Sequence, residues 1–218
     1  MKDLTYEFDL SVLEHGISYT TVGYKAEECL GQYRSLHDQL RMDSSSTVLD
    51  VGCGLALGYS QLYTVAAYTG IDKSEMMIRG ARLLYDNRID VVAGDFMDFS
   101  LDRKPGEGPF LDRLQYDFIL MSGIFNVSST WPVVARMVRH AWKHAKVGIG
   151  VAYQRVNCDD PQFTIYPMAK WTKLFQSLTS NITYDASWSE INATMTARRN
   201  RDGTKNKTTD DEILETEG

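Results

Sequence analysis

Cysteine is scarce in this sequence and long apolar runs are missing, and both absences narrow the class of protein. The three cysteines, Cys29, Cys53 and Cys158, are odd in number and far apart, so they suggest neither a disulfide framework nor a zinc site. No apolar run approaches the ~20 residues that span a bilayer. The first residues carry acids where a signal peptide would carry a basic and then an apolar stretch. We therefore expect reduced thiols, no membrane partner and a cytoplasmic location.

Positively charged residues are also fewer than negatively charged ones. The 23 lysines and arginines face 29 aspartates and glutamates, which gives a formal net charge of −6. This balance argues against a protein that holds nucleic acid mainly by neutralising phosphates, although it is compatible with a local basic patch. We therefore expect no nucleic-acid partner. Much of the acidic excess lies in residues 200–218, where large apolar side chains are few, so we expect this tail to be disordered.

Short apolar strands alternate with amphipathic helices along most of the chain. Strands are expected at 47–51, 68–71, 90–93, 116–121, 147–153, 181–186 and 191–197, and helices at 24–41, from the turn after 54 through 66, and at 74–85, 132–143 and 167–178. The alternation predicts an α/β fold with a mostly parallel, seven-stranded sheet and helices on both faces. The last two strands are close enough to form a hairpin, so one of them runs antiparallel to its partner.

The length of 218 residues suits one domain with additions at its ends. We expect an N-terminal arm and helix over residues 1–46, which would cover a ligand of the main domain. The main domain would then span residues 47–199, and the acidic tail residues 200–218.

Polar signals follow three successive strands. Asp50-Val-Gly-Cys-Gly54 closes the first strand, and its glycines allow the backbone to approach a ligand closely. Asp72 ends the second strand, where a carboxylate can accept both ribose hydroxyls of a nucleoside, and Asp95 ends the third. Taken singly, the glycines could form an ordinary turn and each acid could cap a helix. Because ligands bind outside the carboxyl ends of parallel strands, the three signals together predict an adenosine site.

These segments resemble the first motifs of the class I S-adenosylmethionine-dependent methyltransferases. The resemblance rests on Val48-Leu-Asp-Val-Gly-Cys-Gly54, Gly70-Ile-Asp-Lys-Ser-Glu-Met-Met77 and Gly94-Asp-Phe96, and it covers about residues 47–198. It implies a Rossmann-like methyltransferase fold and S-adenosylmethionine as the cofactor. One position departs from the family pattern, because Ala56 stands where the family often has a third glycine.

The resemblance also implies roles for individual residues. Asp50, Gly52 and Gly54 would line the methionine part of the cofactor, Asp72 the ribose, and Asp95 with Phe96 the adenine. The full set of implied cofactor-binding residues is Asp50, Gly52, Cys53, Gly54, Asp72, Lys73, Met76, Gly94, Asp95, Phe96, Ser122 and Gly123.

The segment Met121-Ser-Gly-Ile-Phe-Asn126 would, by the same resemblance, face the transferred methyl group. It lacks the Asn/Asp-Pro-Pro-aromatic tetrapeptide of amino-methylating DNA enzymes, so we do not expect an exocyclic base nitrogen as the acceptor. Phe125 could close over the acceptor or belong to the core. Asn126 could orient the acceptor by hydrogen bonds or cap the following turn. We expect the acceptor to be a small molecule.

The segment from His15 to Tyr24 is rich in small and aromatic residues. In related enzymes such a segment folds over the cofactor as a lid, and here it would bring Tyr19 and Tyr24 to the acceptor. The alternative is a loosely packed arm.

Two other functions fit part of the pattern. A nicotinamide-dependent oxidoreductase also uses a glycine turn, but its GxGxxG motif would need glycine at Leu57, and the chain has no second substrate domain. A non-catalytic scaffold protein could keep the fold and the cofactor without catalysis. Because no cluster of Cys, His, Asp or Glu has the spacing of metal ligands, we expect no metal. The sequence identifies neither a general base nor the acceptor.

Overall fold

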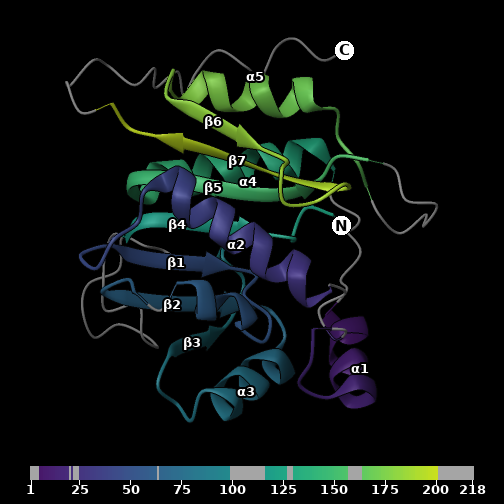
Figure 1. Cartoon of the computed structure of the whole chain (residues 1–218). Coiled ribbons are helices and arrows are strands. Elements are labelled where there is room, and N and C mark those ends of the chain that lie inside the picture. Colours follow the sequence, from purple (N-terminus) through teal and green to yellow (C-terminus); the bar gives the residue numbers. More distant parts are fainter. Residues whose placement is uncertain are drawn as a thin grey trace.

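The structure of the chain, a computed structural model, describes residues 5–19, 21, 25–62, 64–98, 116–126, 130–156 and 164–200 (Figure 1). The helices are α1 (Thr5–His15), α2 (Ala26–Leu40), the 3-10 helix η2 (Leu57–Gln61), α3 (Glu75–Leu84), α4 (Trp131–His144) and α5 (Met168–Leu178). The strands are β1 (Thr47–Val51), β2 (Ala67–Asp72), β3 (Asp90–Ala93), β4 (Tyr116–Ser122), β5 (Ala145–Gln154), β6 (Ile182–Asp185) and β7 (Asn192–Arg198).

The seven strands form one sheet in the order β3-β2-β1-β4-β5-β7-β6. Neighbours among β1 to β5 run parallel, and β7 runs antiparallel to both β5 and β6. The predicted fold class is therefore confirmed, including the C-terminal hairpin. Strand order reverses between β1 and β4, and such a reversal is where ligands bind in open α/β sheets.

Helices cover both faces of the sheet, each over its own apolar core. α2 and α3 pack on one face, and α4 and α5 pack on the other. Successive strand residues point to opposite faces, so Val48 joins the first core and Leu49 the second. Both side chains are fully buried, which explains why β1 reads as a continuous apolar run rather than an alternating one.

The expected strands are all present within two residues of their predicted bounds, but one expected helix is wrong. Among the described residues between the glycine turn and Ala66, the chain forms only the short η2. Gly58 of η2 lies against the ring of Tyr33, and a Cβ at Gly58 would collide with that ring. The residues after η2 include threonine and valine, whose branched side chains favour a helix less than alanine or leucine does.

The helix α1 is an element that the sequence pattern did not predict. It ends at Gly16, which has a φ of 64° and donates its N–H to the carbonyl of Val12 at 2.9 Å. Glycine is favoured at this position because a left-handed residue commonly ends a helix. α1 contacts α3 and lies beyond the arrowheads of β1 to β3 in Figure 1. Among the helices in the described ranges, none is long and apolar enough to cross a bilayer.

The hairpin of β6 and β7 turns a polar face toward α2. Gln39 donates to Oγ1 of Thr194 at 2.6 Å, and Ser35 donates to Asp185 at 2.5 Å. The opposite face of β7 is apolar and belongs to the core under α5. Hydrogen bonds therefore hold α2 to the hairpin, whereas apolar contacts hold it to the middle of the sheet.

Candidate functional site

The glycine turn after β1, residues 52–54, is hydrogen-bonded to the end of β2. The N–H groups of Gly52 and Cys53 both donate to the carbonyl of Ile71, at 2.7 and 3.1 Å. Gly52 and Gly54 have φ values of 71° and 53°, a region that side chains rarely adopt. A Cβ at Gly52 would also collide with Cγ2 of Ile124. Glycine is therefore required at Gly52 both by its conformation and by the loop that follows β4.

Asp72 joins the glycine turn to the start of α3. Its Oδ2 accepts the N–H of Gly54 at 2.9 Å, and its Oδ1 accepts the N–H of Ser74 at 2.9 Å. Burial raises the pKa of Asp72, and the hydrogen bonds from these two N–H groups act against that rise. The Asp72 carboxylate therefore lies between the glycine turn after β1 and the start of α3. Asp72 is the last residue of β2, where the sequence predicted it.

The end of β3 lies next to the end of β2. Gly94 donates its N–H to the carbonyl of Asp72 at 2.8 Å, and Lys73 forms an ion pair with Asp95 at 2.7 Å. Burial raises the pKa of Asp95, but the hydrogen bonds from Lys73 and from the N–H of Met97 outweigh it and hold this pKa below its usual value. The structure thus brings together the predicted residues from the ends of the first three strands.

Asp50 is fully buried under α2, and two tyrosines hold one of its oxygens. Tyr33 and Tyr68 donate their hydroxyls to Oδ2 at 2.9 and 2.8 Å. Within the described part of the chain, the other oxygen, Oδ1, has no hydrogen-bond partner. Burial raises the pKa of Asp50 to about 7; the two hydroxyls lower it, and the nearby Asp72 raises it.

This buried carboxyl predicts a particular pH dependence of stability. Folded Asp50 keeps its proton to about pH 7, whereas an unfolded aspartate loses it near 3.8, so the folded chain binds more protons between these values. The free energy of unfolding should therefore fall as the pH rises through this window. We expect wild type to lose roughly 2–3 kcal/mol more than Asp50→Asn between pH 5 and pH 8, measured by urea unfolding.

The exposed Asp98 supplies the control for this prediction. Asp98→Asn should keep the pH dependence of wild type. Parallel stability curves for wild type and Asp50→Asn would contradict the assigned protonation.

The loop after β4, which was predicted to face the transferred methyl group, is hydrogen-bonded to β5. Gly123 has a φ of 77° and donates its N–H to the carbonyl of Ala152 at 3.2 Å. Ser122 is buried, and its hydroxyl has no hydrogen-bond partner among the described residues. Phe125 is only 1% exposed and packs against Trp171 in the core, which is the second of its two predicted alternatives.

Asn126 has a backbone partner that neither of its predicted roles included. Its Oδ1 accepts the N–H of Gln154, at the end of β5, at 2.9 Å. Its carbonyl accepts the N–H of Thr164 at 2.9 Å. Asn126 therefore ties the loop after β4 to β5 and to the segment before α5.

Four other predicted residues lie within the described ranges, and their side chains differ in burial. Phe96 is buried, with its ring against His140 at a centroid distance of 5.0 Å. Cys53 is buried beneath Gly70, where a Cβ would collide with its sulfur. Met76, on the first turn of α3, is partly exposed. Tyr19 packs at the edge of the core under α2, while Tyr24 lies outside the described residues.

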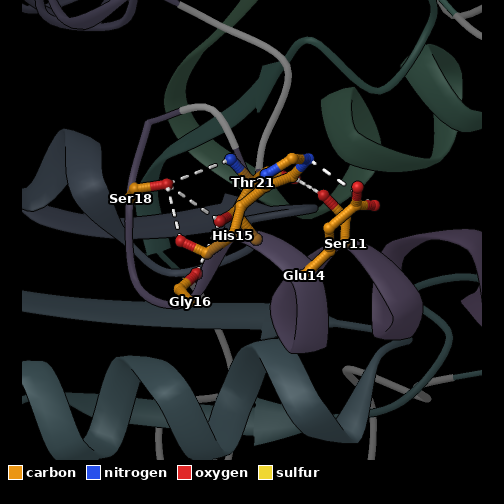
Figure 2. Close-up of polar contacts among 6 residues, drawn as sticks. All are labelled: Ser11, Glu14, His15, Gly16, Ser18 and Thr21. Carbon is orange, nitrogen blue, oxygen red and sulfur yellow. Dashed lines mark hydrogen bonds and ion pairs between the residues drawn. The ribbon is translucent and has the colours of Figure 1, made fainter.

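The predicted lid segment turns back on α1 (Figure 2). Thr21 donates its hydroxyl to the carbonyl of Gly16 at 2.5 Å, and its own carbonyl accepts the hydroxyl of Ser11 at 3.0 Å. Ser18 lies within this turn, 3.1 Å from the Thr21 hydroxyl. The turn and α1 therefore form one unit, although four residues of the segment, Thr20, Val22, Gly23 and Tyr24, lie outside the described ranges.

This unit also contacts the candidate site directly. Ser74 donates its hydroxyl to Asp9 of α1 at 2.5 Å, and the same oxygen accepts the N–H of Met77 at the start of α3. A hydrogen-bonded chain thus runs from Asp9 through Ser74 and Asp72 to Gly54.

Sequence reasoning found the acids of the site but missed their partners. Tyr68 carried a usable signal, because it lies two residues before Gly70, which pairs with Asp50 in the sheet register and so puts Tyr68 on the same face. Tyr33 carried no such signal, because it lies on α2 and no strand register relates it to Asp50. Asp9 had no signal, because nothing in the pattern predicted α1. In the part of the chain that the structure describes, no group of three Cys, His, Asp or Glu side chains could hold a metal ion.

Comparison with known proteins gives a consistent picture of the fold. No family model and no curated protein matches the chain. Among solved structures, the N-methyltransferase NodS from Bradyrhizobium japonicum, in complex with S-adenosylhomocysteine, matches with a TM-score of 0.63 and 17% identity over 90% of this chain and 98% of that one. The amino pentose methyltransferase CalS10 from Micromonospora echinaspora, bound to S-adenosylmethionine, matches with a TM-score of 0.62 and 13% identity over 87% and 97%.

A third match is the magnesium protoporphyrin IX methyltransferase from Synechocystis PCC 6803 with bound S-adenosylhomocysteine. Its TM-score is 0.59 and its identity 12%, over 84% of this chain and 88% of that one. At these identities the likeness concerns the arrangement of the backbone. The chain has the fold of the class I S-adenosylmethionine-dependent methyltransferases.

Proposed function

We propose that the chain is an S-adenosylmethionine-dependent methyltransferase that acts on a small molecule. The observation that carries the proposal is the position of Asp72, whose carboxylate meets the glycine turn and the start of α3 at the carboxyl end of β2. A partly buried acid at this point can accept ribose hydroxyls when a nucleoside is bound. The three matched structures that contain this cofactor or its product support the assignment.

Two buried polar atoms on β1 and β4 are available to hydrogen-bond a ligand at the carboxyl ends of these strands. Oδ1 of Asp50 and the hydroxyl of Ser122 have no partner within the described ranges, and they belong to the adjacent strands β1 and β4. Unpaired buried groups are rare in folded proteins and call for an explanation. The carboxylate of Asp50 would complement the positive charge of the methionine part, and that charge would in turn favour the ionised form of Asp50.

We assign the other parts of the cofactor to predicted residues by the contacts that each residue makes. Asp72 would bind the ribose, with Met76 beside it on α3. Asp95, fixed by Lys73, would face the adenine. The Phe96 ring packs in the core, so its backbone is the part that remains for the adenine.

The cofactor supplies a methyl group that its sulfonium charge has already activated. If S-adenosylmethionine is bound, its carbon–sulfur bond would break with the electron pair staying on sulfur, and the acceptor's lone pair would form the new bond to carbon. The protein must therefore hold the acceptor in line with the breaking bond, and such orientation can supply up to ~7–11 kcal/mol. A base is needed only when the acceptor carries a proton at neutral pH.

An aromatic cluster beside the ends of β4 and β5 is where we place the acceptor. Trp171 lies in contact with Tyr153 and Trp131, at centroid distances of 4.6 and 5.3 Å. The hydroxyl of Tyr153 and the indole N–H of Trp171 are buried without partners among the described residues. Small-molecule sites combine apolar walls with a few such polar groups. The negative net charge also favours a small acceptor over nucleic acid.

We further propose that α1 and the turn after it act as a lid. Asp9→Ala removes the contact between α1 and Ser74 but leaves Ser74 free to cap α3. Loss of this hydrogen bond should lower affinity for S-adenosylmethionine by roughly two- to tenfold in calorimetry. Removal of residues 1–24 should leave the sheet folded and lower affinity further, with methyl transfer reduced most, because an open site admits water to the acceptor.

Glu14→Ala provides the control for the lid, since Glu14 is an exposed residue of α1 and, within the described ranges, contacts only the neighbouring His15 through its carboxylate. This variant should bind the cofactor as wild type does. Full-rate methyl transfer by the chain without residues 1–24 would show that the segment is a loose arm.

The function itself is tested by supplying acceptors and measuring release of S-adenosylhomocysteine. Fractionated small-molecule extracts with radiolabelled S-adenosylmethionine should yield a labelled product in at least one fraction, and Asp72→Ala should abolish that label. Binding of the cofactor without transfer to any small-molecule, protein or nucleic-acid fraction would favour a non-catalytic scaffold.

A further inference from the structure

A basic pocket lies at the opposite end of the sheet from the glycine turn. It has a volume of about 390 Å³, and three of its eight lining residues are Arg41, Arg198 and Arg199. The other lining residues are threonines, asparagines and a glutamine, and none of the eight is acidic. This concentration of positive charge stands out in a chain whose net charge is −6.

The position of the pocket separates it from the proposed methyltransferase site. Arg198 ends β7 and pairs with Gly148 near the start of β5, and Arg41 follows the last residue of α2. The cofactor residues lie instead at the carboxyl ends of β1, β2 and β3. The pocket lies near the amino ends of the parallel strands and the cofactor residues lie at their carboxyl ends. A ligand in the pocket would therefore not touch the residues assigned to the cofactor.

One wall of the pocket is a fixed set of hydroxyl and amide groups. The hydroxyls of Thr183 and Thr196, paired across β6 and β7, are 2.5 Å apart, and Thr183 donates to Oε1 of Gln39 at 2.8 Å. These bonds belong to the polar interface that holds α2 against the hairpin. The wall is therefore formed before a ligand arrives, which lowers the entropic cost of binding.

Arg199 is fixed at the rim of the pocket. Its guanidinium donates to the carbonyls of Ala145 and Trp142 at 3.0 and 2.6 Å and lies over the Trp142 ring, 4.4 Å from the ring centroid. These contacts anchor the charge of Arg199 beside the end of α4. A guanidinium held in this way loses little freedom when an anion binds near it.

Arg41 is held at the rim by its backbone rather than by its side chain. It caps α2 with φ 52° and ψ 52°, the left-handed conformation for which glycine is the favoured residue. Its side chain is exposed, and no hydrogen bond or ion pair engages its guanidinium within the ranges that the structure describes. The unpaired guanidinium of Arg41 is therefore attached to the end of a helix, which limits the movement of its backbone.

We propose that this pocket binds a small phosphate-bearing molecule. The guanidinium of Arg41 can pair with phosphate oxygens in two parallel hydrogen bonds, and the fixed positive charge of Arg199, which lines the same pocket, complements the multiple charge of a phosphate or diphosphate. The threonine and amide wall can hydrogen-bond the remaining oxygens or a polyol attached to them. The volume lies at the lower end of the range for small-molecule sites, which suits a single metabolite.

The test uses calorimetry of the full chain with sodium pyrophosphate. Wild type should show saturable binding, and Arg41→Gly should weaken it by roughly ten- to a hundredfold. Glycine suits the left-handed cap, so this variant should melt at the same temperature as wild type or higher, which separates loss of binding from loss of folding. Arg139→Ala, which removes an exposed arginine of α4 outside the pocket, should bind pyrophosphate as wild type does.

Other outcomes would overturn the proposal. These are absence of saturable binding by wild type, equal weakening by Arg41→Gly and Arg139→Ala, or tighter binding of citrate than of pyrophosphate. Displacement of pyrophosphate by S-adenosylhomocysteine would also overturn it, because the phosphate would then occupy the cofactor site. The proposal is independent of methyl transfer, so an inactive chain that binds pyrophosphate in this pattern would still support it.

Discussion

Asp72→Ala is expected to lower the affinity for S-adenosylmethionine by one to two orders of magnitude. Hydrogen bonds to a charged acceptor contribute ~1.5–3 kcal/mol, which corresponds to this range in Kd. The structure adds a second reason, because the Asp72 carboxylate also holds the N–H groups of Gly54 and Ser74. The alanine variant would lose both the ribose acceptor and the tie that fixes the glycine turn. Calorimetric titration with the cofactor measures the effect.

Two further variants separate these contributions. Asp72→Asn keeps one acceptor oxygen without the charge, so its affinity should lie between those of wild type and the alanine variant. Asp98→Ala removes an exposed acid just beyond the site and should leave affinity unchanged. Wild-type affinity in Asp72→Ala would contradict the ribose assignment.

Gly52→Ala is expected to destabilise the fold and to abolish cofactor binding. The left-handed conformation alone costs a residue with a side chain roughly 1–2 kcal/mol. The added Cβ would also push against Ile124 in the loop after β4, and overpacking of this kind costs about 1–3 kcal/mol more. The free energy of unfolding, from urea titration, should therefore fall by roughly 2–5 kcal/mol.

Gly16 offers a matched control for this substitution. Its φ of 64° is close to the 71° of Gly52, but a Cβ at Gly16 would meet no atom within 4 Å. Gly16→Ala should therefore show only the conformational cost. Equal losses of stability in the two variants would show that contact with Ile124 contributes nothing.

The strands could be predicted well because local sequence determines them. β1 and β4 are short apolar runs, and the motif Asp50-Val-Gly-Cys-Gly54 marks the point where β1 ends. The helix predicted from residue 74 begins there, because the Ser74 hydroxyl accepts the N–H of Met77 and caps α3. The alternation of strands and helices predicted the parallel direction of β1 to β5, and the final hairpin predicted an antiparallel strand, whereas the order of the strands comes from the structure.

The errors occurred where distant parts of the chain decide the structure. The shortness of η2 reflects the Tyr33 ring of α2, which lies against Gly58. The partners of Asp50 come from α2 and β2, so no motif around Asp50 could name both. α1 is stabilised by contacts with α3 rather than by a strong apolar pattern of its own. Burial of Phe125 likewise depends on Trp171, which lies on α5.

The central claim is that the carboxyl ends of β1, β2 and β3 bind S-adenosylmethionine. Equilibrium dialysis of the full chain against radiolabelled S-adenosylmethionine, with S-adenosylhomocysteine as competitor, tests it most directly. The account predicts saturable binding at a single site per chain, displacement by S-adenosylhomocysteine and strong weakening in Asp72→Ala. Absence of saturable binding, or binding that neither S-adenosylhomocysteine nor Asp72→Ala affects, would contradict it.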